Sequence, residues 1–184
     1  VIFIYGGSQG ADIINNAILE VLPELLSRYQ IIHQTGMNLY DGVVSQSRLI
    51  LENNKNIERY KPLAYLNNLT IRMAAGISSI VISRAGSSIF EIASWGIPSI
   101  IIPITNSNGD HQRKNAFSYA RAYACEVIEE SNLTKHVLVA EIDKLLGDND
   151  RLLKMKNNAL SFASPDAAAR IAQIAINEAL SHES

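Results

Sequence analysis

The sequence predicts one α/β domain spanning residues 1–184, built on a doubly wound, mostly parallel sheet of the Rossmann-like kind. Short β-branched runs alternate with longer helical patterns, and most of these runs are apolar throughout instead of alternating. Strands of that kind are covered by helices on both faces, as in a parallel sheet. We therefore expect any ligand in the crevice beyond the carboxyl ends of the strands.

The strands are predicted from six short runs that are rich in β-branched residues. In chain order they are Val1–Tyr5, Gln30–Gln34, Ile57–Tyr60, Ser79–Ser83, Ser99–Ile102 and Glu126–Ile128.

The helices are predicted between these strands and after the last of them. The final one opens on Ser164, Pro165 and Asp166, where serine can cap, proline suits the first turn and aspartate complements the helix dipole. The predicted helices are Ala11–Arg28 with an interruption at Pro23, Leu39–Leu51, Asn68–Ala75, Ser87–Trp95, Asp110–Ala124, Thr134–Leu146, Asp150–Phe162 and Pro165–Leu180.

Composition excludes several classes of protein. A single cysteine, Cys125, forms no intramolecular disulfide and fits a reducing cytosol. Sixteen Lys and Arg against eighteen Asp and Glu give a net charge of -2, which argues against a dedicated nucleic-acid binder. No apolar run approaches the ~20 residues of a membrane span. Because the chain starts without Met inside an apolar run, we expect it to be part of a longer protein.

A glycine-rich loop follows the first predicted strand, with the sequence Gly6-Gly7-Ser8-Gln9-Gly10-Ala11. Its glycines permit positive φ and a close approach of backbone amides to a ligand, so the loop is a candidate phosphate site. It matches neither GxGxxG nor a Walker loop, and the strand after it ends without the acidic residue that would hold an adenosine ribose. The alternative is an ordinary tight turn between strand and helix.

A second loop follows the fourth predicted strand and leads from Ser83 to Glu91. Gly86 lets the chain turn into a helix whose first amides, at Ser87, Ser88 and Ile89, would face an anion such as a diphosphate. Further along this helix, the Glu91 carboxylate could accept from both hydroxyls of a ribose. The alternative is that Glu91 is a capping-box acid.

A third, polar loop follows the fifth predicted strand and enters the next helix. It contains Asp110, His111 and Gln112, and the amide of Gln112 offers a sugar both a donor and an acceptor. The alternatives are that Asp110 is only a helix cap and His111 only a solvated residue of the first turn.

Together these loops resemble one family. The motifs GGSQGA, HQTG, SRAG with a downstream Glu, GIPSIIIP and DHQ-x-x-NA occur in the order found in the carboxyl-terminal half of the MurG family of bacterial peptidoglycan glycosyltransferases. The resemblance spans essentially the whole chain. It implies the donor half of a two-domain GT-B architecture that binds UDP-N-acetylglucosamine (UDP-GlcNAc). The amino-terminal half, absent here, would bind the lipid-linked muramoyl acceptor and contact the cytoplasmic face of the bacterial inner membrane.

The resemblance also assigns roles to residues. Gly7 and Ser8 are expected near the diphosphate, and the backbone of Leu66 is expected to contact the uracil. The turn around Arg84 is expected to contact the phosphates or the sugar. Glu91 is expected to bind the ribose, and Gln112, beside His111, is expected to bind the GlcNAc. This chain has one residue fewer between Gly86 and Glu91 than the family usually has, which leaves the helix register open. The full set is Gly7, Ser8, Leu66, Arg84, Gly86, Ser87, Ser88, Ile89, Glu91, His111 and Gln112.

The implied reaction is an inverting transfer of GlcNAc to undecaprenyl-diphospho-muramoyl-pentapeptide, the step from lipid I to lipid II in peptidoglycan synthesis. Helix amides and the glycine loop would stabilise the leaving diphosphate, so we expect neither a metal nor a cofactor. The sequence offers no convincing general base, and the fragment alone is expected to be inactive.

Two other functions stay open. One is a non-catalytic nucleotide-sugar-binding subunit of a two-subunit GlcNAc transferase. The other is a relative of the UDP-GlcNAc 2-epimerases, which share the fold and the donor but need acid and base residues from both domains.

Overall fold

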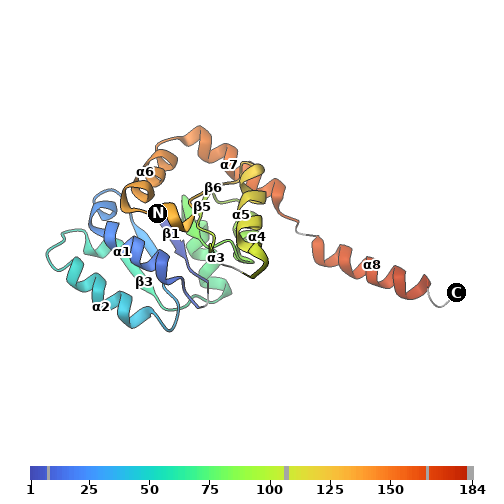
Figure 1. The fold of residues 1–184 in the computed structure, drawn as a ribbon, viewed down its shortest axis with the longest axis horizontal. Coiled ribbons are helices and arrows are strands. Elements are labelled where there is room, and N and C mark those ends of the chain that lie inside the picture. The colour runs from blue at the N-terminus through green and yellow to red at the C-terminus, as the bar shows by residue number, and fades with distance from the viewer. Residues whose placement is uncertain (8, 106–107, 165, 182–184) are drawn as a thin grey trace.

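The computed structural model describes residues 1–7, 9–105, 108–164 and 166–181, and at its centre is a sheet flanked by helices (Figure 1). The sheet has six strands in the order β3-β2-β1-β4-β5-β6. Every neighbouring pair of strands is parallel. The predicted fold class is therefore confirmed. The strands are β1 (Ile2–Tyr5), β2 (Ile31–Gln34), β3 (Tyr60–Leu63), β4 (Ile80–Ser83), β5 (Ser99–Ile101) and β6 (Cys125–Val127).

Helices connect the strands and follow the last one (Figure 1). Short 3-10 turns precede β3, α5 and α6. The helices are α1 (Asp12–Leu26), α2 (Tyr40–Ile50), α3 (Asn68–Gly76), α4 (Ser88–Trp95), α5 (His111–Arg121), α6 (Lys135–Leu146), α7 (Asn149–Phe162) and α8 (Ala167–Ser181).

The core consists of two apolar layers, one on each face of the sheet. Ile2 and Ile4 of β1 pack into the layer that contains α1 and α6, whereas Phe3 and Tyr5 pack into the layer beneath α3, α4 and α5. Successive side chains of a strand point to opposite faces, so a strand buried on both sides must be apolar at every position. As a result, Tyr5 ends β1 on the α4 side of the sheet.

The third strand lies three residues later than the sequence predicts. Ile57–Arg59 forms a 3-10 turn, and β3 pairs with β2 from Ile31 opposite Tyr60 to Gln34 opposite Leu63. Pairing with β2 sets this register, which the local residue pattern does not encode. Pro62, which has no N–H to donate, is accommodated because β3 is an edge strand.

The predicted interruption of the first helix at Pro23 is wrong. Helix α1 is continuous through Pro23, and Leu19, Leu22 and Leu26 around it are buried. Proline removes one helical N–H and usually kinks or breaks a helix. Here, tertiary packing of the apolar face holds the helix together across that position.

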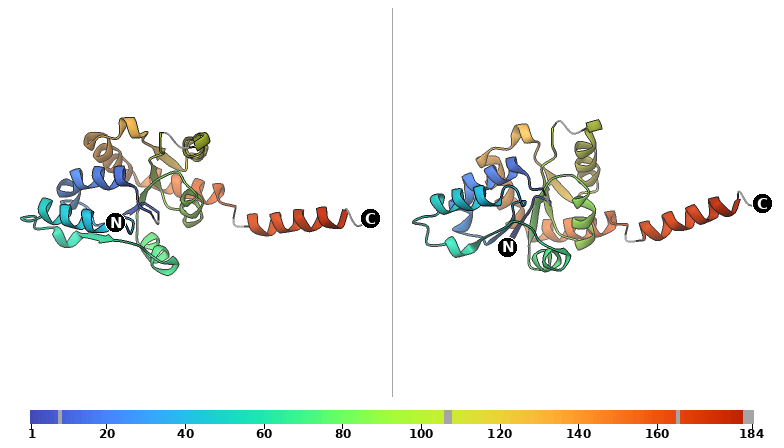
Figure 2. Two further views of the ribbon diagram at one scale, coloured as in Figure 1. Left: turned by 60° about the horizontal axis from the view of Figure 1, so that its bottom comes forward. Right: turned by 90° about the horizontal axis from the view of Figure 1, so that it is seen from below.

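Helix α8 extends away from the rest of the chain in all three views (Figures 1 and 2). Its described side chains are all exposed. The predicted start at Pro165 lies outside the described residues. Among the residues that the structure describes, no helix is both long and apolar enough to span a membrane.

Candidate functional site

A cleft of about 790 Å³ opens at the carboxyl ends of the central strands. Its walls come from the ends of β1, β2 and β4, from the loops after β1, β3, β4 and β5, and from residues of α1, α3, α4 and α5. The strand order reverses between β1 and β4, which is where ligands bind in open α/β sheets. The predicted site residues that line the cleft are Gly7, Arg84, Gly86, Ser87, Ser88, Glu91 and Gln112.

The glycine loop approaches the end of β2 closely. Gly7 and Gly10 have φ of 72° and 80°, and a Cβ on Gly10 would lie 2.1 Å from the carbonyl oxygen of Thr35. Position 10 therefore requires glycine, because any other residue would be strained at this φ and its Cβ would overlap the Thr35 carbonyl oxygen. Gly7 lines the cleft. Ser8, which the sequence predicts beside the diphosphate, lies outside the described residues.

Gln34 connects the glycine loop to the loop after β3. Its side chain is fully buried; Nε2 donates to the Gly7 carbonyl oxygen at 2.7 Å, and Oε1 accepts from the Leu66 amide at 3.2 Å. Leu66 is itself buried and does not line the cleft, whereas its neighbour Tyr65 does. Sequence reasoning missed Gln34, although a polar residue at the end of an apolar strand was a usable signal.

The turn after β4 brings part of its predicted set to the cleft. Gly86, Ser87 and Ser88 line the cleft, but Ile89 is fully buried and its amide donates to the Gly86 carbonyl oxygen at 3.3 Å. Helix α4 begins at Ser88. Of the three residues predicted to offer amides to the phosphates, Ser87 and Ser88 line the cleft and Ile89 does not.

Arg84 lines the cleft, yet its guanidinium also has partners within the domain. It lies 2.6 Å from Glu130 Oε1 and donates to the Ile102 carbonyl oxygen at 3.1 Å. Burial alone would raise the pKa of the Glu130 carboxyl, but the hydrogen bond from the Thr105 amide and the Arg84 charge outweigh it and lower that pKa. Arg84 thus joins the ends of β4, β5 and β6.

Glu91 lies in the cleft and accepts a hydrogen bond at Oε2 from the Tyr5 hydroxyl, over 2.9 Å. Ser87 is the N-cap of α4 and makes no capping hydrogen bond through its side chain. Glu91 is then the fourth residue after the cap instead of the third, so the capping-box alternative is wrong. Burial, followed by the hydrogen bond to Glu91 and its charge, raises the pKa of Tyr5.

The third loop brings one of its two predicted contacts to the cleft. Gln112 lines it, and its Oε1 accepts from the Ile104 amide at 3.2 Å. His111, the first residue of α5, does not line the cleft. Asp110 has a left-handed φ of 56° and forms no side-chain cap, so the capping alternative is wrong there too.

Sequence reasoning also missed Arg72, a cationic residue of α3 that lines the cleft. A guanidinium suits a diphosphate because its fork of N–H groups pairs with anionic oxygens. Among the described residues, no three His, Cys, Asp or Glu side chains gather as a metal site.

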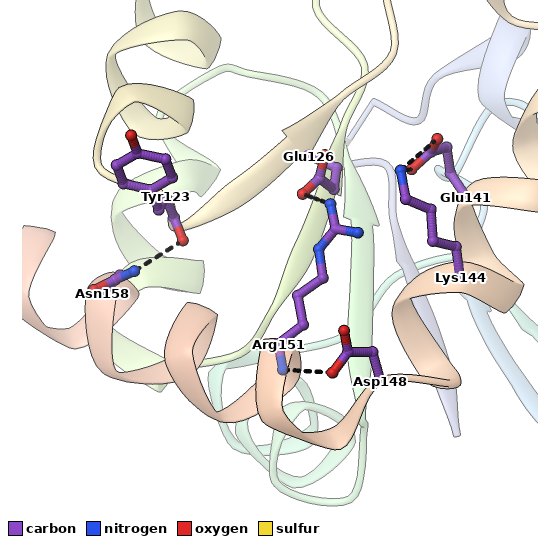
Figure 3. Close-up of polar contacts among 7 residues, drawn as sticks. All are labelled: Tyr123, Glu126, Glu141, Lys144, Asp148, Arg151 and Asn158. Atoms are coloured by element: carbon purple, nitrogen blue, oxygen red, sulfur yellow. Dashed lines mark hydrogen bonds and ion pairs between the residues drawn. The ribbon is translucent and has the colours of Figure 1, made fainter.

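A second hollow, of about 680 Å³, lies between β6 and α7 and contains none of the predicted site residues. Figure 3 shows its polar contacts: Arg151 pairs with Glu126, and Asn158 donates to the Tyr123 carbonyl oxygen at 3.2 Å. Asp148 caps α7 by accepting from the Arg151 amide at 2.9 Å. The pair of Arg151 with Glu126 attaches α7 to the edge strand β6, and Asn158 attaches it to the turn before that strand.

Comparison with known proteins identifies the family. The model of the glycosyltransferase family 28 C-terminal domain matches residues 1–171. The chain belongs to this family. The family 28 domain is 39% identical over 178 residues to the UDP-N-acetylglucosamine–N-acetylmuramyl-(pentapeptide) pyrophosphoryl-undecaprenol N-acetylglucosamine transferase of Leuconostoc citreum, covering 94% of this chain and 46% of that protein. It thus spans about half the length of the curated relatives it matches.

Solved structures give the same relationship. The crystal structure of Acinetobacter baumannii MurG has a TM-score of 0.79 to the family 28 domain at 25% identity, over 94% of this chain and 48% of that one. A UDP-GlcNAc 2-epimerase from Neisseria meningitidis bound to UDP-GlcNAc has a TM-score of 0.66 at 16% identity, over 96% and 43% of the two chains. The second likeness shows the fold alone, so the transferase relationship is favoured over the epimerase alternative.

Proposed function

We propose that the cleft of this family 28 domain binds UDP-GlcNAc and that the domain is the donor half of a GlcNAc transferase. The observation that carries the proposal is the gathering of Glu91, Gln112 and the Ser87–Ser88 turn in one cleft at the switch point of the sheet. Relatives that match 94% of the chain are named for transfer of this sugar to an undecaprenol-linked muramyl pentapeptide.

In this proposal different residues bind different parts of the donor. Glu91 accepts from the ribose hydroxyls, the amides at Ser87 and Ser88 bind the diphosphate with the glycine loop, and Gln112 meets the GlcNAc. Gln34 holds the Leu66 loop, which faces the uracil, against the glycine loop. His111 stays a predicted neighbour of the sugar.

The proposed chemistry is inverting transfer to lipid I. The 4-hydroxyl of the muramyl sugar attacks the anomeric carbon of GlcNAc and gives its proton to a general base. The bond from that carbon to the diphosphate oxygen breaks, and UDP leaves. The domain stabilises the charge that develops on the leaving diphosphate through backbone amides and dipoles. The general base, the acceptor site and the contact with the cytoplasmic membrane face belong to the other half of the protein.

Calorimetric titration tests the donor assignment. We expect the chain to bind UDP-GlcNAc more tightly than ADP-glucose or GDP-sugars, because backbone recognition of a pyrimidine edge at the proposed uracil loop leaves little room for a purine. Binding should be the same with magnesium or with EDTA, since amides and dipoles supply the phosphate site. Equal affinity for ADP-glucose would refute the uracil assignment, and a requirement for magnesium would refute the metal-free phosphate site.

A further inference from the structure

The Glu91 carboxylate is held by a residue from a different element. Tyr5, the last residue of β1, donates its hydroxyl to Glu91 Oε2 over 2.9 Å, and both residues line the cleft. Glu91 is exposed on α4, where a glutamate side chain with no partner would sample several rotamers. The hydrogen bond selects one orientation of the carboxylate within the cleft.

Tyr5 is itself fixed by the sheet. It is paired with Gln34 on β2 and with Ser83 on β4, and only 7% of it is exposed. Its ring stacks on Phe3 with centroids 5.5 Å apart and lies 5.8 Å from the ring of Trp95. The hydroxyl is therefore presented to Glu91 from a rigid support.

We propose that Tyr5 is a positioning residue for nucleotide binding, which sets the Glu91 carboxylate to accept from both hydroxyls of the ribose. The inference rests on the proposed function. A carboxylate offers about four lone-pair positions, and Tyr5 occupies one of them. Oε1 and the remaining lone pair of Oε2 stay available to a vicinal diol. Because the carboxylate is already oriented, binding loses less rotamer entropy.

The test compares Tyr5→Phe with wild type, because phenylalanine keeps the ring packing and removes only the hydroxyl. Calorimetry on the full chain measures the dissociation constants of UDP and of 2′,3′-dideoxy-UDP, which lacks both ribose hydroxyls. We expect UDP to bind about two- to tenfold more weakly to Tyr5→Phe, as the cost of ordering one long side chain implies. The affinity for 2′,3′-dideoxy-UDP should stay the same.

Tyr29→Phe is the matched control. Tyr29 donates to Asp143 Oδ1 over 2.8 Å, so this variant also removes a tyrosine–carboxylate hydrogen bond, but neither residue lines the cleft. It should bind UDP like wild type. A double-mutant cycle adds a further check. In a Glu91→Ala background, Tyr5→Phe should cost little further UDP affinity, because no side-chain acceptor is left for the Tyr5 hydroxyl to orient.

Three outcomes would overturn the inference while leaving the proposed function intact. Equal losses for UDP and 2′,3′-dideoxy-UDP would indicate a structural role. Unchanged or tighter UDP binding by Tyr5→Phe would indicate that Tyr5 competes with the ribose for Glu91. Additive losses in the Glu91→Ala background would show that Tyr5 acts independently of Glu91. Failure of the proposed function is visible in wild type alone, as absent UDP binding or as equal affinity for the two nucleotides. Either result removes the inference as well.

Discussion

At the residue scale, the cleft depends on side chains that interact across elements. Gln34, fully buried, bonds to two loops, and Tyr5 reaches Glu91 from the central strand. Each of these contacts joins residues that are far apart in the sequence. The carboxylate predicted to bind the ribose is therefore oriented by a residue, Tyr5, that lies outside the local motif around Glu91.

Glu91→Ala is expected to weaken UDP binding by about tenfold to a hundredfold, because charge-assisted hydrogen bonds contribute roughly 1.5 to 3 kcal/mol. Stability should fall by no more than about 1 kcal/mol, since Glu91 makes no helix cap and water in the open cleft can bond to Tyr5. Calorimetric titration and urea unfolding measure the two quantities. Glu58→Ala, which changes an exposed glutamate outside the cleft, is the control and should alter neither. Intact UDP binding by Glu91→Ala would contradict the ribose assignment.

At the element scale, an ion pair connects the strand ends beside the cleft. Glu130 accepts from the Thr105 amide after β5 and pairs with Arg84 after β4, and both charged side chains are 14% exposed. The neighbouring pair of Arg113 with Glu129 is more open, at 42% and 34%. Water therefore screens the attraction between Arg113 and Glu129 more strongly than the attraction between Arg84 and Glu130.

Glu130→Gln is expected to destabilise the chain by about 1 to 3 kcal/mol at pH 7, because it leaves the Arg84 charge without its partner. Glu129→Gln is the matched control and should cost less than about 1 kcal/mol. The pKa of Glu130 is lowered in the folded state, so its contribution is present above its unfolded pKa and is lost as pH falls through the folded value. Urea unfolding should show the gap between wild type and Glu130→Gln closing below about pH 4. A gap that does not change with pH would rule out an electrostatic origin.

At the scale of the whole molecule, the two core layers share one sheet, and α7 contributes to both of them. Met155 packs into the layer of α1 and α6, and Ala159 into the layer beneath α4. Helix α8, in contrast, has exposed side chains throughout its described part and lies apart in every view (Figure 2). Removal of α8 should therefore affect the stability of the chain much less than removal of α7.

We expect the full chain to unfold in one cooperative thermal transition. A chain that ends at Ala163 should have a midpoint temperature within about 3 °C of the full chain, since α8 adds little packing. The control is a chain ending at Gly147, which also lacks α7 and the buried Met155 and Ala159 and should lose the cooperative transition. Calorimetric melting decides both. A large drop in the midpoint on removing α8 alone would show that this helix packs on the domain.

The fold class and most of the cleft residues could be predicted from the residue pattern. Apolar runs such as Ile80–Ser83 are buried on both faces, and strands with this pattern need helices on each side. Gly7 and Gly86 lie in the loops after β1 and β4, and Gln112 lies in the first turn of the helix that follows β5. The carboxyl ends of parallel strands meet at one edge of the sheet, so the sequence could predict that these residues gather there.

The residue pattern could not predict the register of β3, the continuity of α1 at Pro23 or the partners of the polar side chains. His33 illustrates the reason. It is fully buried between the Tyr60 hydroxyl and Asn15 Oδ1, at 2.8 and 2.9 Å, and burial lowers its pKa to about 3. Strand pairing, core packing and the satisfaction of buried polar groups depend on residues distant in sequence, and no local pattern records which of them meet.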